Sequence, residues 1–109
     1  MVNYQAQLDL TFYAISDPTR RAILSQLAQG QAAIMDLASP HSMSLPAISK
    51  QIRVLEKAGL LTRTKKGRVN YCSLNANPLR EAEKWLVFYQ RFWNTRLDAL
   101  EKFLEENPE

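Results

Sequence analysis

The sequence predicts a mainly α-helical fold with a small β-hairpin, in a single domain that spans residues 1–109. Three observations support this prediction. Apolar residues recur at helical spacing in five segments. Residues rich in Thr, Val and Tyr form a single pair of strand-like segments, at 60–65 and 69–74. The length of 109 residues, with 46% hydrophobic side chains, suits one modest core.

A first helix is expected over residues 5–16. Its apolar side chains lie on more than one side: Leu8, Phe12 and Ile15 form one stripe, and Leu10 and Tyr13 point elsewhere. Such a pattern predicts a helix that packs on two partners.

The second helix begins at Asp17-Pro18, an N-cap followed by proline at the first helical position, and ends at Gly30. Its expected core residues are Ile23, Leu24 and Leu27. Arg20 lies on the same side as Leu24 and Leu27. We therefore interpret it as a structural arginine with its stem packed on the core, and direct contact with DNA is the alternative.

Residues 33–38 are expected to form a short third helix and residues 39–43 a turn. The next helix, 44–58, has Ser44 as N-cap, Pro46 in its first turn and Gly59 just beyond its end. One face is apolar and is expected to meet the core; it carries Leu45, Ile48, Ile52 and Leu55. The opposite face is basic, with Lys50, Arg53 and Lys57.

The strands at 60–65 and 69–74 flank a turn with three cations, Lys65-Lys66-Gly67-Arg68. A helix, a turn, a basic helix and a hairpin over residues 17–77 predict a winged helix-turn-helix, and residues 60–74 are its wing. This class binds DNA. A solvated amphipathic helix beside a hairpin that is charged for solubility is the alternative.

Residues 78–106 are expected to form one long helix with two apolar stripes. One stripe holds Trp85, Phe88, Phe92, Ala99 and Phe103, and the other holds Leu86, Tyr89, Trp93, Leu97, Leu100 and Leu104. A surface helix needs only one such stripe, so the second predicts another partner. We assign dimerisation to residues 1–16 and 78–106, through Leu8, Phe12 and the second stripe. An aromatic-lined ligand pocket is the alternative.

Charge divides the chain unevenly. Residues 1–77 carry nine basic and four acidic side chains, whereas residues 78–109 carry five basic and seven acidic ones. Cations gathered in the middle of the chain are typical of a polyanion-binding protein. Double-stranded DNA is the expected partner.

The groups that enzymes and metal sites need are sparse. The single histidine, His41, and the single cysteine, Cys72, lie far apart in the sequence, and no metal-ligand spacing occurs. We therefore expect a protein that is not an enzyme and that has no cofactor and no metal site. Cys72 is expected to be a half-buried strand residue and not a redox sensor. No apolar run is long enough for a membrane and no signal pattern begins the chain, so a cytoplasmic protein is expected.

The expected DNA contacts divide between bases and phosphates. Lys50 and Gln51 are expected to read base edges, with Pro46 or Ala47 against a thymine methyl group. Phosphate contacts are expected from both parts of the winged core, namely Ser44, Ser49, Arg53 and Lys57 on the helix and Lys65, Lys66 and Arg68 on the wing.

These segments resemble the ArsR family of winged helix-turn-helix repressors. The matching stretches are 17–24 (DPTRRAIL), 44–52 (SLPAISKQI), 54–61 (VLEKAGLL) and the wing through Gly67-Arg68 to Tyr71. The resemblance implies a homodimeric repressor with first and last helices at the interface and a recognition helix in each half of a palindromic operator.

Two departures from family patterns qualify the resemblance. Metal-sensing members carry Cys-x-Cys where this chain has Ala33-Ile34-Met35, and others use histidine on the last helix, which here has none. The resemblance therefore implies a metal-independent branch. Gln51 stands where relatives commonly have histidine, which implies a changed operator preference.

Two functional alternatives remain at this point. One is a winged-helix module that binds another protein and no specific DNA. The other is a ligand-gated regulator with a small apolar effector between its helices. Repression rather than activation is what the resemblance implies.

Overall fold

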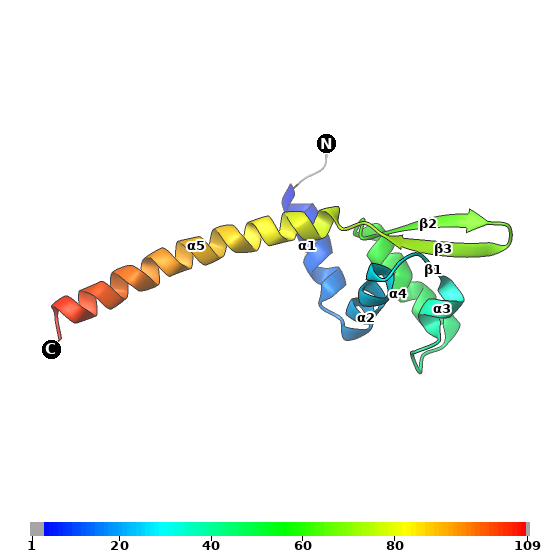
Figure 1. Cartoon of the computed structure of the whole chain (residues 1–109), viewed down its shortest axis with the longest axis horizontal. Helices are drawn as coiled ribbons and strands as arrows, with labels where there is room; N and C mark the ends of the chain where they lie inside the picture. Colours follow the sequence, from blue (N-terminus) through cyan, green and yellow to red (C-terminus); the bar gives the residue numbers. More distant parts are fainter. Residues whose placement is uncertain (1–3, 109) are drawn as a thin grey trace.

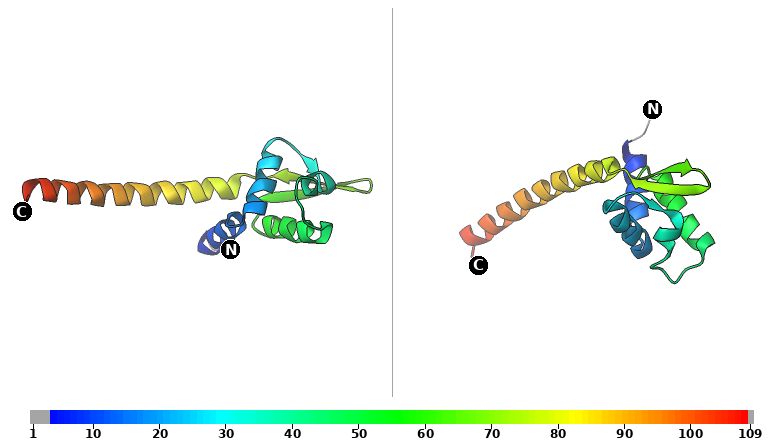
Figure 2. Two further views of the ribbon diagram at one scale, coloured as in Figure 1. Left: turned by 90° about the horizontal axis from the view of Figure 1, so that it is seen from below. Right: turned by 45° about the vertical axis from the view of Figure 1, so that its right-hand side comes forward.

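The computed structural model describes residues 4–108 (Figure 1). A compact winged-helix core carries one long protruding helix, and the molecule measures 70 × 36 × 21 Å (Figures 1 and 2). The elements in chain order are α1 (Tyr4–Ile15), α2 (Pro18–Ala28), β1 (Ala32–Ala33), α3 (Ile34–Ala38), α4 (Leu45–Lys57), β2 (Leu61–Lys66), β3 (Val69–Leu74) and α5 (Asn77–Glu106).

The core forms where α2, α3 and α4 meet the base of the sheet. Ile23, Leu37, Ile48 and Ile52 are each 0% exposed, which confirms the inner faces predicted for these helices. Leu10 also packs against this cluster, although its position on α1 predicts another direction. The core therefore holds α4 by one face and leaves the opposite face to solvent.

Local signals set the two ends of α4. The Ser44 hydroxyl accepts a hydrogen bond of 3.3 Å from the Ala47 amide, as an N-cap does. At the other end the amides of Gly59 and Leu60 donate to the carbonyls of Glu56 and Leu55, with φ of +76° at Gly59. This is the Schellman arrangement, which requires the left-handed conformation that glycine adopts freely.

The sheet has three antiparallel strands in the order β1-β3-β2. The hairpin of β2 and β3 is the predicted wing, closed by the two-residue turn Gly67-Arg68 with φ of +63° at Gly67. The strand β1 was not predicted: Ala33 pairs with Tyr71 there and does not start α3. Two alanines carry almost no strand signal, so only the pairing with β3 defines this strand.

Two burial predictions were wrong. Leu45 is 44% exposed, not inward, because it lies in the first turn of α4, where the helix extends past the core. Cys72 is fully buried, not half-buried, because β3 is the central strand and Ala32 and Arg63 flank it.

The long helix α5 contacts the rest of the chain only near its beginning. α1 lies beside its first turns, where Ala82 is buried, and every residue from Phe88 to Pro108 is exposed (Figure 1). At about 1.5 Å per residue, its 30 residues reach about 45 Å. Most of the predicted apolar stripes therefore have no partner within the described chain.

Candidate nucleic-acid interface

The outer face of α4 presents the cations predicted for DNA contact. Lys50, Arg53 and Lys57 are exposed, and we call these three residues the basic face of α4. The other predicted contact residues of the helix are divided by exposure: Ser44 and Pro46 are exposed, and Ala47, Ser49 and Gln51 are half-buried. A helix of 13 residues with this outline fits the width of a major groove.

The wing tip carries the second set of predicted contacts. Lys65, Lys66 and Arg68 are all exposed around the two-residue turn. The Lys66 ammonium group lies 3.4 Å from the Gln31 amide oxygen and 5.5 Å from the centre of the Tyr71 ring. Lys66 therefore has partners on its own chain, whereas the structure gives Lys65 and Arg68 no such contact.

Arg20 connects α1, α2 and α4. It is 7% exposed and donates to the carbonyls of Ala14 (2.7 Å) and Tyr13 (2.9 Å) at the end of α1. Its Nη1 donates at 2.7 Å to Oε1 of Gln51 on α4. This geometry supports the interpretation of Arg20 as a structural residue, and it engages the oxygen that Gln51 would need to read adenine.

Two amide side chains hold the C-terminal end of α4, and neither of them was predicted as a functional residue. Gln7 donates a 2.9 Å hydrogen bond to the Ala58 carbonyl, and Asn75 donates one of 2.8 Å to the Gly59 carbonyl. Terminal carbonyls of a helix lack intrahelical partners, and this gives the two amides their role. Nothing in a single sequence marks such long-range partners.

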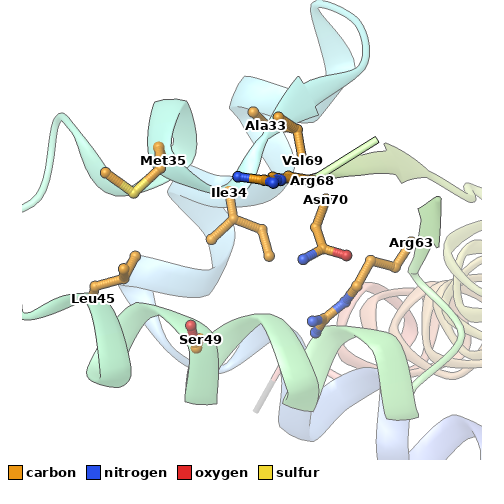
Figure 3. A pocket seen from close by; sticks show the side chains of 9 residues that line it. All are labelled: Ala33, Ile34, Met35, Leu45, Ser49, Arg63, Arg68, Val69 and Asn70. Atoms are coloured by element: carbon orange, nitrogen blue, oxygen red, sulfur yellow. The ribbon is translucent and has the colours of Figure 1, made fainter. Parts of the chain in front are cut away.

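A groove of about 340 Å³ lies between α4, α3 and the wing (Figure 3). We call it the wing groove. Figure 3 shows the Ser49 hydroxyl on α4 and the Arg63 and Asn70 side chains on the wing facing the same space. Its lining residues are Ala33, Ile34, Met35, Leu45, Ser49, Arg63, Arg68, Val69 and Asn70.

The residues predicted for dimerisation fall into two groups. Leu8 is 6% exposed because it packs against its own chain, and Phe12 is half-buried with its ring 5.6 Å from that of Trp85. The others are exposed along α5, at 42–57%: Leu86, Tyr89, Trp93, Leu97, Leu100 and Leu104. The free apolar surface thus belongs to α5, whereas Leu8 and Phe12 support α5 from behind.

The first apolar stripe of α5 is also uncovered from Phe88 to Phe103. A shallow hollow of about 550 Å³ runs along Phe88, Phe92 and Ala99, with Arg91 and Arg96 at its sides. The Arg96 guanidinium lies 4.6 Å from the centre of the Phe92 ring. The aromatic rings of this stripe form an open row along α5. The described part of the chain does not enclose them in a pocket.

Groups for other chemistry do not assemble among residues 4–108. No cluster of three or more His, Cys, Asp or Glu side chains there could hold a metal ion. Burial raises the pKa of the Cys72 thiol, and the nearby Arg63 guanidinium only partly opposes this. His41 lies 3.3 Å from the Gln26 amide oxygen, in the turn before α4. None of the described helices combines the length and hydropathy that a membrane span requires.

The fold and the two basic elements define the class of protein: a winged helix-turn-helix of the kind that binds DNA. The sequence profile described as "Bacterial regulatory protein, arsR family" matches residues 17–63, from the N-cap of α2 into β2. The chain belongs to the ArsR family.

Similar proteins extend the match beyond that region. The transcriptional repressor SdpR of Bacillus subtilis is 38% identical over 76 residues, which cover 70% of this chain and 84% of SdpR. The HTH-type transcriptional regulator Rv2034 of Mycobacterium tuberculosis is 31% identical over 97 residues, 89% of this chain and 88% of Rv2034. The crystal structure of the ArsR family transcriptional regulator RHA00566 superposes with a TM-score of 0.80 at 40% identity, over 86% of this chain and 97% of that one.

Proposed function

We propose that this transcriptional regulator is a homodimeric repressor that binds a palindromic operator in the cytoplasm. The observation that carries this proposal is the shared exposure of two cationic elements, the basic face of α4 and the wing tip. Repression would follow when the bound dimer occludes a promoter. The relative SdpR is named a transcriptional repressor, which supports repression rather than activation.

We assign different roles to two neighbouring residues of α4. Lys50 is exposed on the basic face, and we assign it to base edges, with Ala47 or Pro46 beside a thymine methyl group. Gln51 instead takes a supporting role, because its Oε1 already accepts from Arg20. Phosphates would be held from both sides of the site, by Ser44, Ser49, Arg53, Lys57, Lys65, Lys66 and Arg68.

A second copy of this chain is the partner that we propose for α5. Residues such as Leu97 and Leu104 are more than half exposed in the single subunit. A helix with that much uncovered apolar surface gains stability by burial, and closed symmetric dimers are the commonest solution. In such a dimer, two α4 helices about 34–36 Å apart would face successive turns of the major groove.

We also place the chain in a metal-independent branch of the family. The support is local: Ala33-Ile34-Met35 offers no thiolate, and α5 has no histidine. No cofactor is part of the proposal.

A selection experiment tests the proposed function. The purified protein would be incubated with a pool of random 30-base-pair duplexes, and bound DNA would be amplified and sequenced over several rounds. A repressor of this kind enriches one inverted repeat with half-sites about one helical turn apart. Affinity for it should exceed that for random DNA by at least about a thousandfold and should fall steeply with salt.

The same experiment addresses the alternative of a protein-interaction module. Such a module enriches no sequence, and its weak binding to duplexes is equal for all of them at each salt concentration. That result would overturn the proposal. A ligand-gated form, with a small apolar effector between the helices, remains a subtype of the main proposal and would show as ligand-dependent loss of operator affinity.

A further inference from the structure

The wing groove combines two features that suit one kind of ligand. Its charged lining residues are Arg63 and Arg68, and no carboxylate is among its lining. Outside α5, the large apolar side chains that are exposed among residues 4–108 are five, and three of them line this groove: Met35, Leu45 and Val69. The groove therefore fits a ligand with an anionic group and a less polar body.

The position of the groove favours one such ligand. In the proposed complex, α4 lies in the major groove and the wing tip reaches the adjacent minor groove. These two grooves of a duplex are separated by one sugar-phosphate strand. That strand has to pass between α4 and the wing, where the wing groove lies (Figure 3).

We propose that the wing groove seats one deoxyribose-phosphate unit of the DNA backbone. The phosphate lies between the Arg63 guanidinium, the Asn70 amide and the Ser49 hydroxyl, while the sugar packs on Leu45 and Val69. This inference rests on the proposed function and adds Arg63, Asn70 and the apolar wall to the set of DNA contacts.

Arg63 already has a carboxylate partner on its own chain. Its Nη2 lies 3.3 Å from Oε1 of Glu56 on α4, and the two side chains are 28% and 41% exposed. A phosphate in the groove competes with Glu56 for the same guanidinium. Glu56 therefore weakens DNA binding, although it lies on the same helix as the basic face.

Two charge-matched pairs of variants test the site on the selected operator. Arg63→Gln should weaken binding about tenfold and lower the slope of log affinity against log salt by about one, because one phosphate contact is lost. Its control is Arg80→Gln, since Arg80 lies on α5 outside the groove and bonds to Asn77 of its own helix. This control should leave the slope unchanged.

The second pair predicts a change of opposite sign. Glu56→Gln frees Arg63 and should strengthen operator binding about threefold. Glu81→Gln is the matched control, because its carboxylate forms a similar ion pair of 3.2 Å with Lys84 on α5. An equal gain from both variants would show that only net charge matters and would overturn the proposed site.

A scan of the operator with single methylphosphonate substitutions locates the phosphate. At one position in each half-site, removal of the charge should weaken the wild type but not the Arg63→Gln variant, since the two changes delete the same contact. If no position couples to Arg63, while Lys50→Ala still reduces discrimination at one base pair of the operator, the groove assignment is wrong and the proposed function stands. If no duplex is selected at all, the proposed function itself has failed.

Discussion

Nη1 of Arg20 donates a 2.7 Å hydrogen bond to Oε1 of Gln51, and this bond joins α2 to the middle of α4. The same guanidinium donates to two carbonyls of α1. A charged group this deeply buried needs each of these partners, because an unpaired donor costs its full desolvation energy. Together these bonds fix how the basic face of α4 is set relative to α1 and α2.

Gln51→Ala tests this supporting role. The free energy of unfolding should fall by about 1–2 kcal/mol, because Arg20 loses a partner inside the protein. Operator affinity should fall while the order of preference among bases stays the same. Urea unfolding and a panel of single-base operator variants provide the two measurements. A relaxed preference confined to one adenine position would instead show that Gln51 reads that base.

Lys50 and Lys65 are expected to differ in what they recognise. Lys50→Ala should cost about 1–3 kcal/mol of discrimination at one base pair, because a base-edge contact is lost. Lys65→Ala should weaken operator and random DNA alike and reduce the salt slope by about one. Competition binding at several salt concentrations separates the two effects. Equal loss of selectivity from both variants would contradict this assignment.

Trp93 is expected to hold the dimer together. Its side chain is 53% exposed in the single subunit and lies in the middle of the stripe from Leu86 to Leu104. Trp93→Glu should weaken dimerisation at least about a hundredfold, because it places a carboxylate in an apolar interface. The matched control is Asn94→Glu, which adds the same charge to the polar side of α5. Light scattering across a dilution series measures both, and an unchanged mass for Trp93→Glu would exclude this interface.

Cys72 is expected to be unreactive and to influence the alkaline stability of the fold. Burial raises the pKa of its thiol, so the unfolded chain releases the thiol proton at a lower pH than the folded chain. The free energy of unfolding should therefore fall as the pH rises above the ordinary thiol pKa of about 8.5. A Cys72→Ala variant should lack this component of the decline.

The same burial should limit the access of thiol reagents. At pH 8 the native protein should react with Ellman's reagent at least about a hundredfold more slowly than the unfolded chain, because reaction requires local opening. Rapid reaction of the native protein would indicate an accessible thiolate and would restore a redox role as a candidate.

Short-range chemistry made much of the core fold predictable. Asp17, Ser44 and Gly59 act within a few residues of their position, and the structure confirms each of them as a helix-end signal. The alternation of Thr, Val and Tyr around Gly67 likewise predicted the wing. Local hydrogen bonds and backbone preferences explain these successes, since they depend on neighbours in the sequence.

Contacts across the chain were not predictable in the same way. The bond between Arg20 and Gln51 joins residues 31 positions apart, and helical spacing predicts only the side of α2 on which Arg20 lies. Leu45 has the spacing of a core residue, yet the core ends before the first turn of α4. Spacing gives the direction of a side chain and not the extent of the surface that covers it. The wing groove, which depends on three separate elements, was invisible for the same reason.

The reach of α5 has a consequence for gene dosage. In the proposed regulator, two recognition helices become a matched pair only after two chains meet through a helix that is mostly uncovered in one subunit. At concentrations where single chains predominate and most operators are free, operator occupancy then varies with the square of the number of chains per cell. A twofold fall in that number lowers occupancy about fourfold, so pairing through one protruding helix makes repression respond more steeply than the supply of protein.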